Sequence, residues 1–133
     1  MINGLVITHG DVGRELVRVV EMILGPVDGL TALTNSGKSV QALTGEIGEL
    51  LSASGEGETR GTLLFIDDFG GSCANAAQLA AAEGGEPILT GVNLAMLLDF
   101  ATWRESMEAG ELSRRLVEKG REAIAVLSMG RED

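Results

Sequence analysis

The chain is poor in aromatic, cysteine and basic residues. It has no tyrosine, one tryptophan and three phenylalanines among 133 residues, while 44% of its residues are hydrophobic. The core must therefore be built from aliphatic side chains. Acidic residues outnumber Lys and Arg by 20 to 10, which gives a formal net charge of −10. Because nucleic acids are bound mainly through clustered Lys and Arg, this charge argues against a nucleic-acid partner.

The single cysteine excludes an intramolecular disulfide, and the start of the chain lacks the basic-then-apolar pattern of a secretory signal. No apolar run approaches the ~20 residues that a membrane-spanning helix needs. These features predict a cytoplasmic protein. The length is close to the commonest domain size, so residues 1–133 are expected to form a single domain.

Short apolar runs alternate with helical patterns along the chain. Strands are expected over residues 1–8, 30–33, 62–66 and 87–92, and helices over 11–23, 40–51, 73–82, 94–106 and 111–127. The last of these carries Ile124 and Leu127 on its apolar side. The small, polar segment 52–61 is expected to be an exposed, mobile connection. This alternation predicts an α/β fold: a single open, doubly wound, mostly parallel sheet of about four to five strands, with helices on both faces.

Two polar residues stand immediately before expected helices. Asp11 precedes the first helical pattern, and Asn93 precedes the segment LAMLLDFATWRES. Asp and Asn side chains accept hydrogen bonds from the unpaired N–H groups of a helix start, so both residues are predicted N-caps.

The only histidine, His9, directly follows the first expected strand, and Asp67 and Asp68 follow the third. In open parallel sheets, ligands bind beyond the carboxyl ends of the strands, where the strand order reverses. If the first and third strands are neighbours, a carboxylate can therefore reach the imidazole.

Glycines stand at the same strand ends. Gly10 follows His9, and Gly70 and Gly71, with Ser72, follow the acidic pair. They leave backbone amides uncovered at helix starts, where the helix dipole is positive, which predicts an anion site. A neutral imidazole nitrogen there can take a phosphoryl group while the carboxylate fixes the tautomer, and neither a metal nor a cofactor is expected. The competing interpretation is structural: a hydrogen-bonded histidine at a strand end, with Asp and Gly residues that only shape turns.

Three motifs carry a family resemblance: THG after the first strand, IDDFGGSCANAA in the middle and GVNLAML later. In order and spacing they resemble the mannose-type IIA component of the bacterial sugar phosphotransferase system, over nearly the whole chain. The resemblance implies that His9 accepts a phosphoryl group from the phosphocarrier protein HPr and passes it to a IIB component. It also implies that Asp67 orients His9, that Gly10, Gly70, Gly71 and Ser72 bind the phosphate, and that Ser72 caps the following helix.

The resemblance further implies a cytoplasmic homodimer. No Pro/Ala-rich linker or second domain follows in this sequence, so the IIB partner is expected on a separate chain. Any association with membrane IIC and IID components would be indirect. A free-standing regulatory IIA protein, which signals phosphorylation state without sugar transport, is the alternative function. Cys73 and Ala95 stand where the family usually has proline.

Two other functions share parts of this pattern. TNSGKS followed by LLFIDD imitates the Walker motifs of a nucleotide hydrolase, but the first glycine of a Walker A loop would fall on Ala32, within a strand. A receiver domain needs an acidic pair after the first strand, where this chain has His9. The sequence therefore supports a nucleotide hydrolase or a receiver domain less well than it supports a phosphoryl carrier.

Overall fold

A parallel sheet forms the centre of the protein in a computed structural model, which describes residues 1–54 and 61–131. Strands and helices alternate along most of this part of the chain. In chain order the elements are β1 (Asn3–Thr8), α1 (Val12–Leu24), β2 (Leu30–Thr34), α2 (Val40–Ser54), β3 (Thr62–Ile66), α3 (Gly71–Ala81), β4 (Ile88–Leu89), α4 (Leu94–Trp103) and α5 (Ala109–Glu122).

The strand order in the sheet is β2-β1-β3-β4, and every pair of neighbouring strands is parallel. β1 pairs with β2 on one side, where Thr8 lies opposite Thr34, and with β3 on the other, where Ile7 lies opposite Ile66. The order reverses between β1 and β3, so the carboxyl ends of these strands form the switch point of the sheet. The predicted α/β fold is confirmed.

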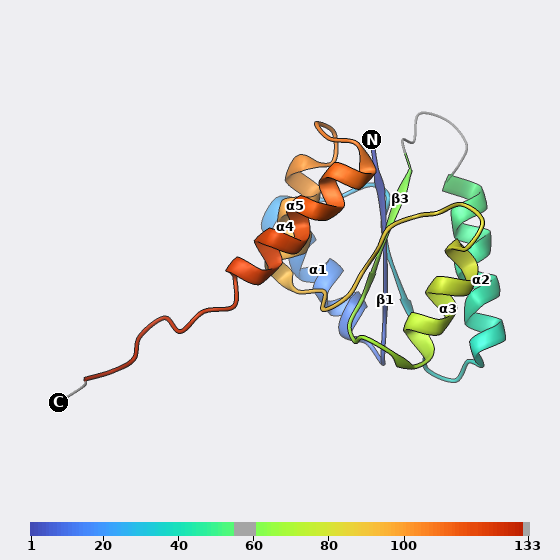
Figure 1. The fold of residues 1–133 in the computed structure, drawn as a ribbon, viewed down its shortest axis with the longest axis horizontal. Helices are drawn as coiled ribbons and strands as arrows, with labels where there is room; N and C mark the ends of the chain where they lie inside the picture. Colours follow the sequence, from blue (N-terminus) through green and yellow to red (C-terminus); the bar gives the residue numbers. More distant parts are fainter. Residues whose placement is uncertain (55–60, 132–133) are drawn as a thin grey trace.

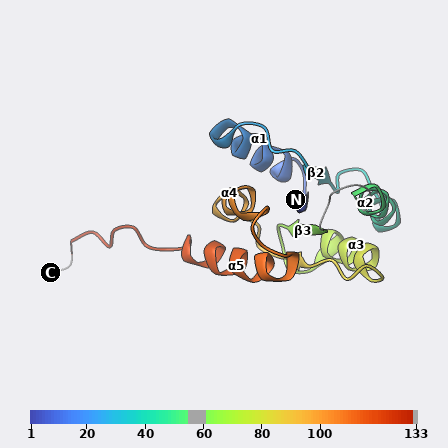
Figure 2. The ribbon, with the colours of Figure 1, turned by 90° about the horizontal axis from the view of Figure 1, so that it is seen from above.

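The helices form a layer on each face of the sheet. Figure 1 shows α2 and α3 on one side and α1, α4 and α5 on the other, and the same two groups separate in Figure 2. Each layer has its own hydrophobic core. Phe65 and Phe100 meet edge to face in the core under α1, α4 and α5, whereas Leu43, Ile47 and the small side chains of α3 fill the other. As expected, aliphatic side chains make up most of both cores.

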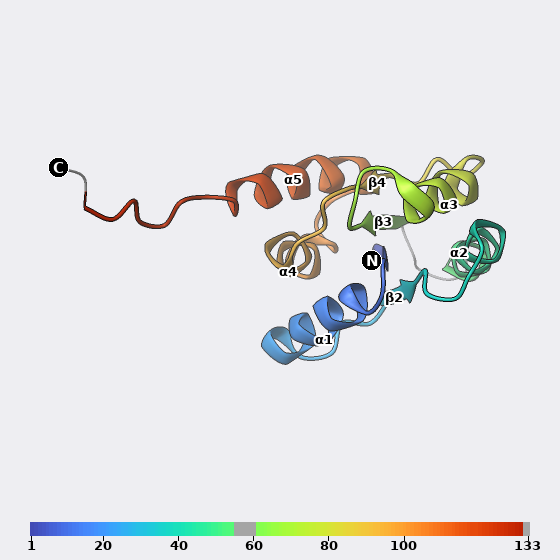
Figure 3. The ribbon, with the colours of Figure 1, turned by 90° about the horizontal axis from the view of Figure 1, so that it is seen from below.

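The last helix is shorter than the periodicity predicts. It ends at Glu122, and residues 123–131 run as an extended tail that projects away from the sheet (Figure 3). Gly120 packs against Met96 and Asn93, which lie at the start of α4. Residues beyond Glu122 therefore lie past the start of α4, so α4 cannot cover their apolar side chains. Ile124 and Leu127, expected on the buried side, are exposed instead.

The other boundaries differ less from those expected. The fourth strand covers two residues, Ile88–Leu89, and α2 extends to Ser54 into the predicted connection. The rest of that connection, residues 55–60, lies outside the described residues. Within 1–54 and 61–131, the structure has no helix that is both long and apolar enough to cross a membrane.

The start of α1 depends on a hydroxyl from the preceding strand. Asp11 occupies the N-cap position, but its side chain makes no capping hydrogen bond and lies 3.5 Å from Arg14 instead. Asp11 therefore has the predicted N-cap position, but the capping hydrogen bond expected from its side chain is not formed. Buried Thr8 accepts the Gly13 N–H at 2.7 Å, since the helix passes close to the end of β1. At α4 the prediction is confirmed: Asn93 accepts the Met96 N–H at 3.0 Å.

Thr8→Val should destabilise the fold, because it keeps the shape of the side chain but leaves the buried Gly13 N–H without its acceptor. We expect the free energy of unfolding to fall by about 1–2 kcal/mol, measured by urea denaturation. The matched control is Thr102→Val, which removes an exposed hydroxyl that bonds Leu98 within α4 and should change stability by less than about 0.5 kcal/mol. Equal effects from the two substitutions would contradict the capping role.

Candidate functional site

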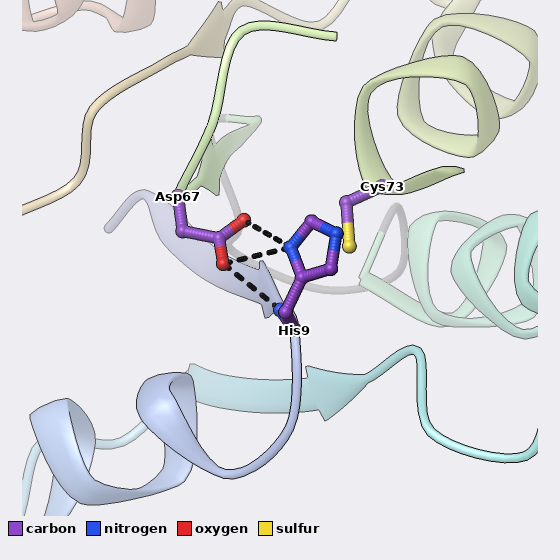
Figure 4. A group of neighbouring side chains, drawn as sticks. All are labelled: His9, Asp67 and Cys73. Atoms are coloured by element: carbon purple, nitrogen blue, oxygen red, sulfur yellow. Dashed lines mark hydrogen bonds and ion pairs between the residues drawn. The ribbon is translucent and has the colours of Figure 1, made fainter. Parts of the chain in front are cut away.

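His9 and Asp67 meet at the switch point between β1 and β3. The imidazole Nδ1 of His9 lies 3.0 and 3.2 Å from the two carboxylate oxygens of Asp67, and the His9 backbone N–H donates to Asp67 at 2.9 Å (Figure 4). The carboxylate thus binds both the backbone and the ring of His9. A carboxylate accepts hydrogen bonds only, so Nδ1 carries the proton and Nε2 of a neutral ring has a free lone pair.

The Asp67 carboxylate is held in its charged form. Partial burial alone would raise its pKa, but hydrogen bonds from the backbone and ring of His9 lower the pKa below its ordinary value. A lowered carboxyl pKa stabilises the folded state above the ordinary Asp pKa, and this contribution is lost only as the pH falls through the lowered value. The orienting charge is therefore fully present at neutral pH.

The free nitrogen of His9 faces the start of α3. A Cβ atom added at Gly71 would lie 4.0 Å from Nε2, so the absence of a side chain keeps this space open. Gly70 and Gly71 have φ of +113° and +79°, and Gly10 has φ of +53°, conformations that glycine adopts at little cost. The amides of the first turn of α3, which have no partner within the helix, and the positive dipole end of this 11-residue helix thus lie beside an imidazole whose side chain is 50% exposed.

The expected site residues come together, with one correction and one addition. Ser72 was expected to cap a helix that begins at Cys73, but α3 begins two residues earlier, at Gly71, and Ser72 lies in its first turn. Its hydroxyl instead contacts Asn35, a residue just after β2 that was not among the predicted site residues. Asn35 also accepts the Gly10 N–H. Its position after a strand end, beside a glycine-rich turn, was the available signal.

Asp68 accepts the N–H of Phe69 at 2.8 Å, in an exposed turn. Phe69, the next residue, is 87% exposed. The two neighbouring carboxylates therefore have different surroundings: Asp67 binds His9, whereas Asp68 shapes the loop. On the far side of the site, Lys38 pairs with Glu46 at 2.7 Å and Ala32 lies within β2, an arrangement unlike a Walker A loop.

Cys73 lies next to the imidazole and is fully buried (Figure 4). Burial raises the pKa of its thiol, the negative charge of Asp67 raises it further, and a contact with Ser72 acts in the opposite direction. Donor atoms of His9, Asp67 and Cys73 lie within 4.8 Å of one another, the spacing of a candidate metal site. However, Nδ1 and the carboxylate already bind each other and the thiol stays protonated, so these groups fit a hydrogen-bonded carrier site better than a metal centre.

Comparisons with known proteins identify the family of the chain. The chain is 28% identical over 123 residues to the mannose-specific EIIAB component of the phosphotransferase system (PTS) of Escherichia coli strain K12, covering 90% of this chain and 38% of the relative. It is 29% identical over 126 residues to the sorbose-specific EIIA component of Lacticaseibacillus casei, covering 93% of this chain and 89% of the relative. The chain thus spans well under half the length of the first relative and most of the second.

Among solved structures, the PTS component EIIA from Streptococcus agalactiae matches with a TM-score of 0.84 at 20% identity, covering 95% of this chain and 97% of that one. At this identity the match establishes the fold alone. The family model for EIIA-man, described as the PTS system fructose IIA component, matches residues 4–117 and so includes both His9 and Asp67. The chain therefore belongs to the EIIA-man family of sugar phosphotransferase system IIA components.

Proposed function

We propose that this protein carries a phosphoryl group on Nε2 of His9, accepting it from HPr and passing it to a IIB component on a separate chain. The pairing of Nδ1 with Asp67 supports this proposal most directly, because it leaves the Nε2 lone pair free and aimed at the start of α3. Residues 1–133 act in this role as a single IIA domain in the cytoplasm.

The transfer is an exchange of one nitrogen–phosphorus bond for another. The Nε2 lone pair forms a bond to phosphorus while the bond from phosphorus to the donor imidazole breaks, and the electron pair of that bond returns to the donor nitrogen. The Nδ1 proton stays in its hydrogen bond to Asp67, which stabilises the positive charge that the His9 ring gains. The amides at the start of α3 and the Ser72 hydroxyl stabilise the phosphoryl oxygens.

Loss of His9 or Asp67 should affect labelling differently. With phosphoenolpyruvate, enzyme I and HPr, we expect an acid-labile, alkali-stable label that His9→Ala abolishes. Asp67→Ala should retain the fold and slow labelling by about a hundredfold, because the ring loses its fixed tautomer and orientation. The measurement is the rate of phosphate incorporation, with circular dichroism as the check on folding.

Asp68→Ala is the matched control, since it removes a neighbouring carboxylate that does not contact the imidazole. It should label within about twofold of the wild-type rate, in line with a surface substitution outside the site. A label that survives His9→Ala, or that neutral hydroxylamine removes as it would an aspartyl phosphate, would refute the carrier assignment.

The exposed ring of Phe69 supports a protein as the phosphoryl donor. Phe69 stands two residues after Asp67, and its large apolar side chain, which is 87% exposed, offers an anchor for a docking surface. Phe69→Ser should therefore raise the KM for phosphorylated HPr by about tenfold, which corresponds to an anchor worth about 1.4 kcal/mol. Labelling by the small donor phosphoramidate, which needs no docking surface, should be unchanged.

Leu79→Ser serves as the control for Phe69→Ser, because Leu79 is an exposed apolar residue of α3. It should leave the KM for phosphorylated HPr at the wild-type value. An equal loss with both donors would mean that Phe69 shapes the loop and is not a docking residue.

The tail supports a homodimer. Four apolar side chains of residues 123–131, those of Ile124, Val126, Leu127 and Met129, are at least 70% exposed. An apolar surface of this kind marks an interaction site on a soluble protein. In the proposed dimer the tail of each copy packs against the other copy. The twofold symmetry then buries the apolar side chains of both tails.

Charged residues in the tail should separate the copies. We expect the wild-type protein to have twice the chain mass by light scattering at micromolar concentration, and the double variant Ile124→Glu, Leu127→Glu to have the mass of one chain. Leu79→Glu, which adds the same charge to an exposed leucine outside the tail, should remain a dimer. A wild-type mass of one chain would disprove the homodimer.

A further inference from the structure

Asn35 is held firmly at the carboxyl end of β2. Its backbone N–H donates to the carbonyl of Thr8 at 3.1 Å, which extends the pairing of β2 with β1 by one residue. Its carbonyl accepts the Lys38 N–H at 3.1 Å, closing a turn in which Gly37 has φ of +70°. The main chain at Asn35 is thus fixed from both sides, and the half-buried side chain is directed into the site.

The orientation of the Asn35 amide follows from its neighbours. Its Oδ1 accepts the Gly10 N–H at 3.3 Å, and its Nδ2 donates to the hydroxyl oxygen of Ser72 at 3.2 Å. The Gly10 N–H is a donor only, so the amide atom facing it must be the oxygen. The NH₂ group must then face Ser72. One side chain therefore joins the loop that carries His9 to the first turn of α3.

This contact determines what the Ser72 hydroxyl can do. A hydroxyl has one proton to donate, and Ser72 accepts from Asn35, so its own proton is not used in that bond. In the protein without phosphate the Cys73 thiol is a neighbour of this hydroxyl. Sulfur is a weak acceptor, so an anionic phosphoryl oxygen will draw the proton away from it.

We propose that Asn35 is a positioning residue for phosphoryl transfer: its amide holds Gly10 and orients Ser72, so that the Ser72 hydroxyl donates to the phosphoryl group on His9. This inference rests on the proposed function. Its chemistry is the bond exchange described above, with no additional reactant. The side-chain hydrogen bonds of Asn35 go to Gly10 and Ser72, so in this proposal Asn35 acts through the Ser72 hydroxyl and not on the phosphoryl group itself.

Two substitutions change this contact in different ways. Asn35→Ala removes the amide and lets the hydroxyl rotate, so transfer should slow by about tenfold, less than the ~10²–10³ typical for loss of a whole stabilising donor. Asn35→Asp keeps an acceptor for Gly10, but its second oxygen takes the Ser72 proton and its charge repels phosphate. This variant should be slower still, by about a hundredfold.

The decisive experiment is a double-mutant cycle with Ser72→Ala, in which the rate of His9 labelling is measured with phosphorylated HPr and with phosphoramidate. If Asn35 acts through Ser72, adding Asn35→Ala to Ser72→Ala should slow labelling by less than about twofold. If Asn35 had a merely structural role, the fold-losses in labelling rate from the two single substitutions would multiply in the double variant. The slowing should be the same with both donors, because it concerns the phosphoryl group and not the docking surface.

The control is Asn75→Ala, the same chemical change at an exposed position of α3, which should label at the wild-type rate. Thermal unfolding checks each variant, and Asn35→Asp, which preserves the size of the side chain, provides the test if Asn35→Ala is poorly folded. Wild-type rates in the Asn35 variants, or losses that multiply, would overturn the inference. A wild-type protein that neither donor labels would overturn the proposed function instead.

Discussion

The parallel pairing of β1 with β3 determines where the chemistry of this protein lies. Ile7 is opposite Ile66 in the register, so the two chains leave the sheet side by side and bring His9 next to Asp67 across 58 residues of sequence. A shift of one residue in this register would turn the side chains of one strand to the other face of the sheet. The buried side chains on both faces of β1 and β3 prevent such a shift, because each face has its own core.

Local donors would let this acidic protein hold the proposed phosphoryl group. The net charge of −10 opposes the approach of phosphate, but charges on the surface are screened within about 8–10 Å at physiological salt. Backbone amides and a helix dipole act at contact distance, in a fixed orientation. Gly70 and Gly71 make this possible, because their conformations turn the chain so that α3 begins beside the imidazole.

The sequence pattern predicted that a carboxylate after β3 reaches His9, and the family resemblance selected Asp67 over Asp68, whereas the supporting contacts were not predicted. Strand ends follow from short apolar runs, and the switch-point rule then places a residue after one strand near a residue after another. Asn35 was missed because an asparagine in an Asn-Ser-Gly segment is ordinary turn chemistry, and its second role depends on a neighbour 37 residues away. The last helix was extended wrongly because its apolar periodicity continues past the point where α4 stops covering it.

A carrier must release its phosphoryl group as readily as it accepts it, and the surroundings of His9 suit this requirement. The donors that face the proposed phosphoryl position, the amides at the start of α3 and the Ser72 hydroxyl, are neutral. Neutral donors orient the phosphoryl oxygens without the additional Coulomb attraction that a Lys or Arg side chain would bring, so they hold the group without a full opposite charge. The charge at the site is placed behind the ring instead, on Asp67, where it supports the imidazole equally during acceptance and release. Half of the His9 side chain is exposed, which leaves the ring accessible to a partner protein in either direction of the proposed transfer.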